Sequence, residues 1–209
     1  GKRMSLMGAI YANGRMANAA DYDETFPTGA HFGVSGIAAT LAVCEQAGSS
    51  GEDALLSLIA GYELGGRIAN AIGPLTAIES GKVTGFPAVW GLAAQGVAAA
   101  AGATAKAMNF SGDEFANSIG VAMSNAPLPV GGLWSRTLEL PNCKYNDAGW
   151  CAMTGAFSAI AARQGTTGYP EILDDPAGLL HIYGTDGKGA PILVADLGKV
   201  WMLEDATYK

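Results

Sequence analysis

Charged residues are scarce in this chain: Asp, Glu, Lys and Arg make up 15% of its 209 residues, whereas apolar residues make up 49%. This composition excludes intrinsic disorder and indicates one compact domain with a large buried core. Basic residues are fewer than acidic ones, twelve against nineteen, and the formal net charge is −7. We therefore expect neither nucleic acid nor an anionic membrane surface as a partner.

Disulfide and metal-binding patterns are missing as well. The three cysteines, Cys44, Cys143 and Cys151, form no CxxC pair, and the chain has two histidines. Because this supply of ligands does not fit a structural zinc site, we expect no metal, free thiols and a reducing, cytoplasmic compartment. The chain begins at Gly1 instead of Met, so we infer that the native N-terminus is absent and that a targeting segment cannot be identified.

Common catalytic signatures are absent too. The chain has no GxSxG elbow, no Walker loop, no GxGxxG after a strand and no HExxH pair. The glycine-rich stretch 184–189 lacks a strand-to-helix context and is interpreted as a surface loop. The uncharged stretch 83–105 is long enough to span a bilayer, but it is mostly Gly and Ala and contains Pro87 and Gln95. We expect it to form the central helix of a soluble bundle.

Signals for helix ends, in contrast, are abundant. The sequences at 50–53 and 111–114 each have a serine, a glycine and two acids, the pattern of a helix N-terminal cap. They predict helices over 54–72 and from Phe115 onward, and a third helix is expected over 147–164, ended by a left-handed Gly165. We therefore predict an all-α domain to about residue 190. A connector follows, in which 192–194 and 200–203 have β-like composition.

Polar chemistry is concentrated between Asp21 and His31, a segment with three acids and one of the two histidines. Asp21 and Thr25 are four residues apart, so a helix through them would place both side chains on one face. Pro27 should end that helix, and His31 should open the next one, where the helix dipole favours a neutral imidazole that can act as a base. The alternative is that the acids form a solvated helix end and that His31 is a cap or a surface residue.

Lys144 is a second candidate. It precedes the helix predicted from residue 147, and a cation there opposes the helix dipole unless an anion compensates it. The alternative interpretation is an ordinary solvated lysine at the edge of a loop. Lys209 is the last residue, and composition alone assigns it no role.

Three groups of residues occur in an order that resembles a known family. They are Tyr11-Ala12-Asn13-Gly14 with Asp21-Tyr22-Asp23-Glu24-Thr25 and His31; Lys144 with Gly149, Gly155, Gly165, Thr167-Gly168 and Ile172-Leu173-Asp174; and Leu197-Gly198 through Trp201 to Lys209. Together they span nearly the whole chain. The chain resembles the MmgE/PrpD family, which includes 2-methylcitrate dehydratase, cis-aconitate decarboxylase and iminodisuccinate epimerase.

The resemblance implies that the active site is lined by Asp21, Thr25, His31, Lys144 and Lys209. His31 would transfer a proton, with Asp21 fixing its tautomer directly or through neighbours. The two lysines and Thr25 would bind the substrate, and the lysines would stabilise charge that develops on it.

The resemblance also implies a cofactor-independent lyase that acts on a small di- or tricarboxylate. Loss of water, loss of CO2 and epimerisation share proton transfer at a carbon next to a carboxylate, and a hydro-lyase similar to 2-methylcitrate dehydratase is favoured. The implied architecture is a homodimer with a helical domain over 1–204. Residues 205–209 would begin a smaller α+β lid domain that is missing from this chain. Proteolysis, or a lid carried by a second polypeptide, would explain its absence.

Two departures from the family pattern keep an alternative open. The family commonly has a histidine after a Gly-Phe pair, but Gly85-Phe86 is followed here by Pro87-Ala88-Val89-Trp90. The histidine that often follows the position of Lys144 by three residues is replaced by Asp147. The alternative is therefore a non-catalytic helical subunit that binds carboxylates or scaffolds a partner.

Overall fold

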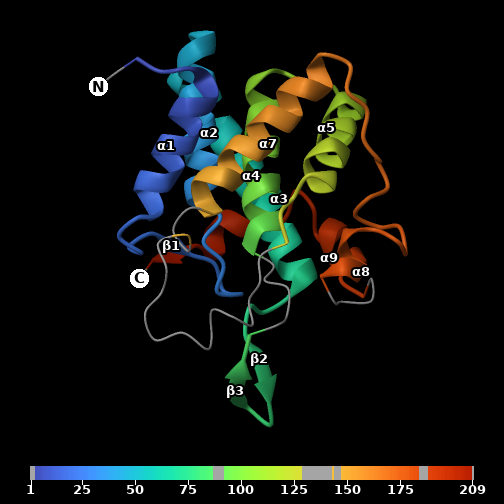
Figure 1. Cartoon of the computed structure of the whole chain (residues 1–209). Helices are drawn as coiled ribbons and strands as arrows, with labels where there is room; N and C mark the ends of the chain where they lie inside the picture. The colour runs from blue at the N-terminus through green and yellow to red at the C-terminus, as the bar shows by residue number, and fades with distance from the viewer. Residues whose placement is uncertain (1–2, 87–91, 129–142, 144–146, 184–187, 209) are drawn as a thin grey trace.

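The computed structural model describes residues 3–86, 92–128, 143, 147–183 and 188–208 (Figure 1). Helices dominate these residues, and the strands are short. The helices are α1 (Leu6–Asn18), α2 (Gly33–Ala47), α3 (Gly51–Ile72), α4 (Leu92–Ala107), α5 (Gly112–Ser124), α7 (Asp147–Arg163), α8 (Leu179–Ile182), α9 (Ala190–Val194) and the 3₁₀ helix η2 (Met202–Asp205). The strands are β1 (Glu24–Thr25), β2 (Ala77–Glu79), β3 (Lys82–Gly85) and β4 (Thr207–Tyr208). The predicted all-α class is confirmed.

Helix α4 forms the centre of the domain, and α2, α3, α5 and α7 all pack against it. Every residue from 93 to 105 is buried. Glycines on two neighbouring helices let the backbones approach closely. A Cβ on Gly61 of α3 would lie 2.8 Å from the Cβ of Ala103, and one on Gly155 of α7 would lie 2.8 Å from the Cβ of Ala100. The small residues of the sequence therefore build a core of closely packed helix backbones.

The central helix begins later than predicted, at Leu92. Part of the stretch expected to be helical belongs to an antiparallel hairpin of β2 and β3. Ser80 and Gly81 join the strands with positive φ angles of 50° and 75°, a left-handed pair that suits a two-residue hairpin turn. The hairpin is largely exposed and has no alternation of buried and exposed residues, so it left no signal in the sequence. Among the described helices, none is both long and apolar enough to cross a membrane.

The predicted helix ends of α3, α5 and α7 are confirmed. The Ser50 hydroxyl accepts a hydrogen bond from the amide of Asp53 (3.1 Å), whose carboxylate accepts one from the Ser50 amide (3.3 Å). Ser111 and Glu114 form the same reciprocal cap at the start of α5. Helix α7 ends at Arg163, and Gly165 has a φ of +99°. These ends were predictable because each depends on residues within one turn.

The segment from 190 to 205 does not form the predicted strands. Ala190–Val194 is helix α9, with a proline in its first turn, and Met202–Asp205 is helix η2. Both elements pack on helix α3. Carbonyl groups at the end of α9 and in the segment that follows it are bound by a side chain of α3 instead of by a neighbouring strand.

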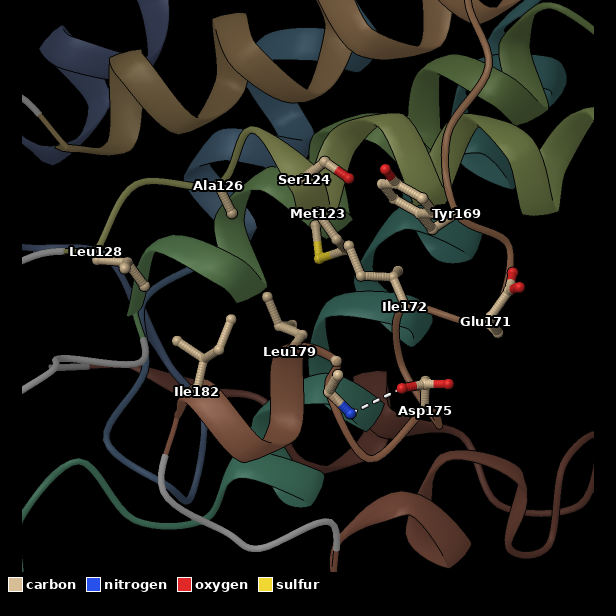
Figure 2. A pocket seen from close by; sticks show the side chains of 12 residues that line it. Met123, Ser124, Ala126, Leu128, Tyr169, Glu171, Ile172, Asp175, Leu179 and Ile182 are labelled. Atoms are coloured by element: carbon tan, nitrogen blue, oxygen red, sulfur yellow. Dashed lines mark hydrogen bonds between the residues drawn. The ribbon is translucent and has the colours of Figure 1, made fainter.

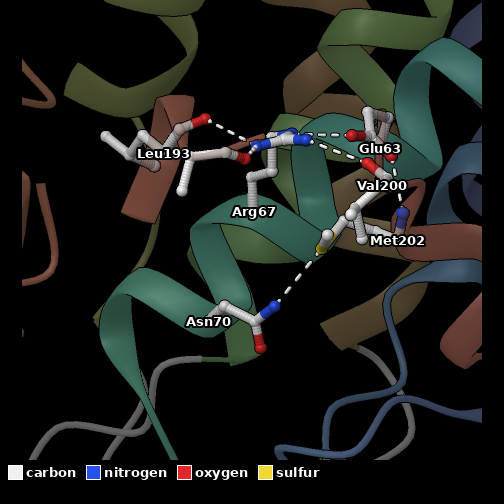
Figure 3. A network of polar contacts seen from close by, with 7 residues as sticks. Glu63, Arg67, Asn70, Leu193, Val200 and Met202 are labelled. Atoms are coloured by element: carbon white, nitrogen blue, oxygen red, sulfur yellow. Dashed lines mark hydrogen bonds and ion pairs between the residues drawn. The ribbon is translucent and has the colours of Figure 1, made fainter. Parts of the chain in front are cut away.

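That side chain is Arg67, which is buried and forms an ion pair of 2.6 Å with Glu63 one turn earlier (Figure 3). Its guanidinium group donates hydrogen bonds to three main-chain carbonyl oxygens: Leu193 (3.2 Å), Ala195 (2.8 Å) and Val200 (3.1 Å). The second carboxylate oxygen of Glu63 accepts from the amide of Met202 (2.7 Å). The pair therefore ties the segment 193–202 to α3 with four hydrogen bonds, a use for which the rigid fork of arginine is suited.

Candidate active site

The predicted helix through Asp21 and Thr25 is not present. Helix α1 ends at Asn18, whose side-chain amide donates to the Asp23 carboxylate (2.6 Å). Asp21 then turns the chain with a φ of +51°. Such side-chain bonds compete with helix continuation, which explains why the spacing of four residues was misleading here.

The residues that follow are extended and form β1, which pairs antiparallel with β4 (Figure 1). Asp23, in the bend before β1, and Thr25, in β1, both approach His31 with their side chains. The side chain of Glu24 instead contacts the first turn of α2. Asp23 was part of the polar segment in the sequence, but the helical spacing selected Asp21 in its place.

His31 lies two residues before α2, close to its predicted place at the start of that helix, and its side chain is 19% exposed. Its Nδ1 atom lies 2.7 Å from the main-chain oxygen of Glu24, 3.4 Å from the Thr25 hydroxyl and 3.8 Å from the Asp23 carboxylate. A carbonyl oxygen can only accept, so the hydrogen is assigned to Nδ1, which donates to Glu24. In the neutral ring this leaves the lone pair on Nε2, where it can accept a proton.

Asp23 lies close to the same ring nitrogen. Its side chain is only 3% exposed, and one oxygen is held by Asn18. The other oxygen faces Nδ1 of His31 and has no hydrogen-bond partner among the described residues. A buried carboxylate so close to the ring would stabilise the imidazolium formed when Nε2 takes up a proton.

Glu24 is a partly buried acid that the sequence did not single out. Its Oε1 atom accepts a hydrogen bond from the amide of Gly33 in the first turn of α2 (2.5 Å). Burial raises the pKa of Glu24 to about 7; the Gly33 amide opposes this shift and the charge of Asp23 adds to it. Burial and the nearby Glu24 charge also raise the pKa of the Tyr62 phenol. The only hint in the sequence was Gly33, since a side chain at that position would collide with this carboxyl group.

The raised pKa of Glu24 predicts a pH dependence of stability. Between its ordinary value of 4.5 and about 7, the folded chain keeps a proton that the unfolded chain has lost. The free energy of unfolding should therefore fall as pH rises through this window, by on the order of 3 kcal/mol from this group. Glu24→Gln should remove the decline, so urea unfolding at pH 5 and pH 8 should show the variant gaining on the wild type at the higher pH. Parallel changes in the two proteins would contradict the assignment.

Lys144 and Lys209 lie outside the described residues, but their described neighbours reach the His31 region. The hydroxyl of Ser35, four residues after His31, donates to the carbonyl oxygen of Ala148, four residues after Lys144 (3.0 Å). Tyr208, which precedes Lys209, is the strand partner of Glu24. Segments that are far apart in the sequence thus meet at the N-terminal end of α2.

The remaining predicted residues are placed as follows. Thr25 lies beside His31, and the described contacts of the His31 ring come from Asp23, Glu24 and Thr25. Asp21 is half-buried, and its amide donates to the carbonyl oxygen of Asn18 (3.0 Å). His181, the other histidine, is exposed on α8. The segment where the family commonly has its second histidine lies outside the described residues.

A cavity of about 520 Å³ lies elsewhere, between α5, the segment 169–178 and α8 (Figure 2). Its walls are mainly apolar, and its charged lining residues are Glu171 and Asp175. None of the described residues that line it is basic, so an anionic substrate would find repulsion and no counter-charge there. We therefore place the candidate active site at His31. No group of three or more potential metal ligands occurs within the described part of the chain.

Comparison with known proteins gives a consistent result. Residues 1–190 match the model of the MmgE/PrpD N-terminal domain. The chain is 28% identical over 170 residues to the cis-aconitate decarboxylase-like protein oryM of Aspergillus oryzae, a match that covers 77% of this chain and 32% of that protein. The chain thus spans about a third of the length of this curated relative. With most of its length matched by the family model and an all-α fold, the chain belongs to the MmgE/PrpD family, to the part formed by its N-terminal domain.

Proposed function

We propose that this chain forms the helical part of a cofactor-independent lyase that acts on a small di- or tricarboxylate. Dehydration of a substrate similar to 2-methylcitrate is favoured over decarboxylation and epimerisation. The observation that carries the proposal is the state of His31. Its Nδ1 is occupied by a main-chain acceptor, and Nε2 is left as the base in a ring that remains 19% exposed.

The acidic groups around His31 require cations to complete the site. Asp23 and Glu24 can support a proton-transfer ring, but they cannot hold a substrate carboxylate. We assign that task to Lys144 and Lys209, whose flanking segments reach the same end of α2. Thr25 would contribute its hydroxyl to substrate binding, and Asp21 would complete the acidic support of the ring. The lysines would also stabilise the charge that develops when the carbon next to a carboxylate loses its proton.

The larger assembly is part of the proposal. Residues 1–204 would form the helical domain, and 205–209 would lead into an α+β lid domain carried by the same polypeptide or a second one. The length of the Aspergillus oryzae relative supports such an additional domain, because the match covers 32% of it. The helical domain would form a homodimer in the cytoplasm.

One observation favours a second candidate function, a non-catalytic subunit that binds carboxylates or scaffolds a partner. The sequence Pro87-Ala88-Val89-Trp90 has no histidine where the family commonly has one. Loss of that group would remove a second proton donor or acceptor. This candidate predicts carboxylate binding without any exchange of carbon-bound protons.

Proton NMR in D2O with citrate, methylcitrate, cis-aconitate and mesaconate tests the two functions. We expect deuterium to replace a carbon-bound proton in at least one of these compounds, together with net conversion. A His181→Gln variant is the matched control, because this exposed histidine lies on α8 and should leave the rates unchanged.

Exchange without net conversion would retain proton abstraction and favour an epimerase over a hydro-lyase. The absence of both exchange and conversion for all four compounds would contradict the lyase. Chemical-shift changes in those compounds, without exchange, would then support the binding subunit.

A further inference from the structure

Glu24 contacts the start of α2 through two different groups. Its main-chain oxygen accepts from Nδ1 of His31 (2.7 Å), and its side-chain Oε1 accepts from the amide of Gly33 (2.5 Å). The two donors are only two residues apart in the chain. The side chain of Glu24 therefore anchors the same peptide unit that determines which nitrogen of His31 carries the hydrogen.

We propose that Glu24 is the positioning residue of His31: its side chain locks β1 onto the first turn of α2 and so keeps its carbonyl oxygen in place as the acceptor for Nδ1. The catalytic consequence of this inference rests on the proposed function. Glu24 itself touches no substrate in this scheme and acts only through the ring.

The side chain is needed because β1 is too short to hold the carbonyl by itself. The strand has two residues and pairs with a strand of two residues. A pairing of this length is marginal without further contacts. Thr207 contributes one, because its hydroxyl donates to the carbonyl oxygen of Thr25 (2.8 Å). The bond between Glu24 and Gly33 joins β1 directly to the first turn of α2, next to the main-chain bond from the Phe26 amide to the Ala30 carbonyl oxygen (2.8 Å).

The space around the carboxyl group fits this role. A Cβ on Gly33 would lie 2.7 Å from Cδ of Glu24 and 3.0 Å from the ring of Tyr62. The missing side chain at Gly33 thus makes room for the carboxyl group between the helix and Tyr62. The ionisable groups that face Glu24 are Asp23 and His31 on its own segment and Tyr62 on α3. Either protonation state keeps an oxygen that can accept from Gly33, so the anchor persists across neutral pH.

Loss of the anchor has a defined chemical outcome. If the Glu24 carbonyl moves away, Nδ1 loses its acceptor, and the ring becomes free to place its hydrogen on Nε2. In that tautomer Nε2 no longer has a lone pair for the substrate proton. Enzymes in which the orienting partner of a catalytic histidine is altered lose activity for this reason.

The test compares Glu24→Ala, Glu24→Gln and Gly33→Ala by NMR of chains labelled with ¹⁵N-histidine. The two histidines of the chain make assignment simple, since a His181→Gln background leaves His31 as the one labelled ring. The wild type and Glu24→Gln should show the Nδ1–H tautomer. Glu24→Ala and Gly33→Ala should show a mixture in which Nε2–H is the larger part. Gly33→Ala is informative because it displaces the carboxyl group without removing it. Alanine is also a better helix former than glycine, so a change of tautomer would not result from lower helix propensity.

Turnover should fall about 100-fold in Glu24→Ala with KM little changed, and Glu24→Gln should restore most of it. An unchanged Nδ1–H tautomer in both Glu24→Ala and Gly33→Ala would overturn the inference. If Glu24→Ala fails to fold, the tautomers of His31 in Gly33→Ala and Glu24→Gln still test the inference. If the tautomer changes but His31→Ala is fully active, the positioning role stands and the proposed function fails, so the two failures can be told apart.

Discussion

Turnover is expected to fall by a factor of about 10² to 10⁴ when His31 is replaced by alanine, the range typical for loss of a general base. The physical reason is that Nε2 of this ring is the proton acceptor that the described geometry leaves available. The loss should appear in kcat measured with whichever carboxylate the NMR screen identifies. The helical circular dichroism signal should be unchanged, because the ring is partly exposed and packs at the end of α2 rather than in the core.

Two further variants sharpen this prediction. Lys144→Ala should abolish turnover as well, because the proposed cation for the substrate carboxylate is lost. His181→Ala removes the other histidine, exposed on α8, and should have no effect. Full activity in His31→Ala or in Lys144→Ala would count heavily against the lyase.

Replacing Arg67 with methionine is expected to lower the free energy of unfolding by about 3–5 kcal/mol, the cost of leaving a buried charge without its partner. The carboxylate of Glu63 would stay buried, and the carbonyl oxygens of Leu193, Ala195 and Val200 would lose their donors. Urea unfolding gives the size of the effect. Limited proteolysis should show earlier cleavage between 193 and 202, because this segment is held by the lost guanidinium group.

The control for this prediction is an ion pair at the surface. Arg163 and Glu114 lie 3.3 Å apart with 34% and 44% of their side chains exposed, and Arg163 also donates to the carbonyl oxygen of Met108 and lies 4.2 Å from the centre of the Phe110 ring. These exposed contacts are weak, so Arg163→Met should cost only about 1–2 kcal/mol. The double variant Glu63→Met and Arg67→Met should be more stable than Arg67→Met alone, since no unpaired carboxylate remains. Equal losses in Arg67→Met and Arg163→Met would show that the buried network contributes little.

Helix ends were predictable from the sequence because their causes are local. The caps at Ser50 and Ser111 and the glycine after α7 depend on contacts within one turn, and the structure contains all three. The prediction of strands near the C-terminus was wrong for the opposite reason, because contacts between distant residues fix this segment. Ile192 and Val194 are β-branched, but the group that holds this segment belongs to α3, more than a hundred residues earlier. Amino-acid composition cannot predict such a contact.

The sequence pointed to the segment that holds the candidate site, but not to the geometry of that segment. The segment between Asp21 and His31 was recognised, and Thr25 lies beside His31 as the resemblance suggested. The extended conformation of Glu24 and Thr25 depends on pairing with residues 207 and 208, which no local pattern reveals. This conformation determines that Asp23 supports the ring and that Glu24 is partly buried. The raised pKa of Glu24 likewise follows from tertiary burial and has no signature in the sequence.

The pairing of β1 with β4 has a consequence for the order of events during synthesis. Thr25 and Thr207 are separated by 182 positions, yet they share a hydrogen bond beside His31. A ribosome must therefore translate residues 207 and 208 before the strand that carries the acceptor for Nδ1 gains its neighbour. Nascent chains that have formed α2, α3 and α4 but have not yet reached β4 would still hold an unfinished site.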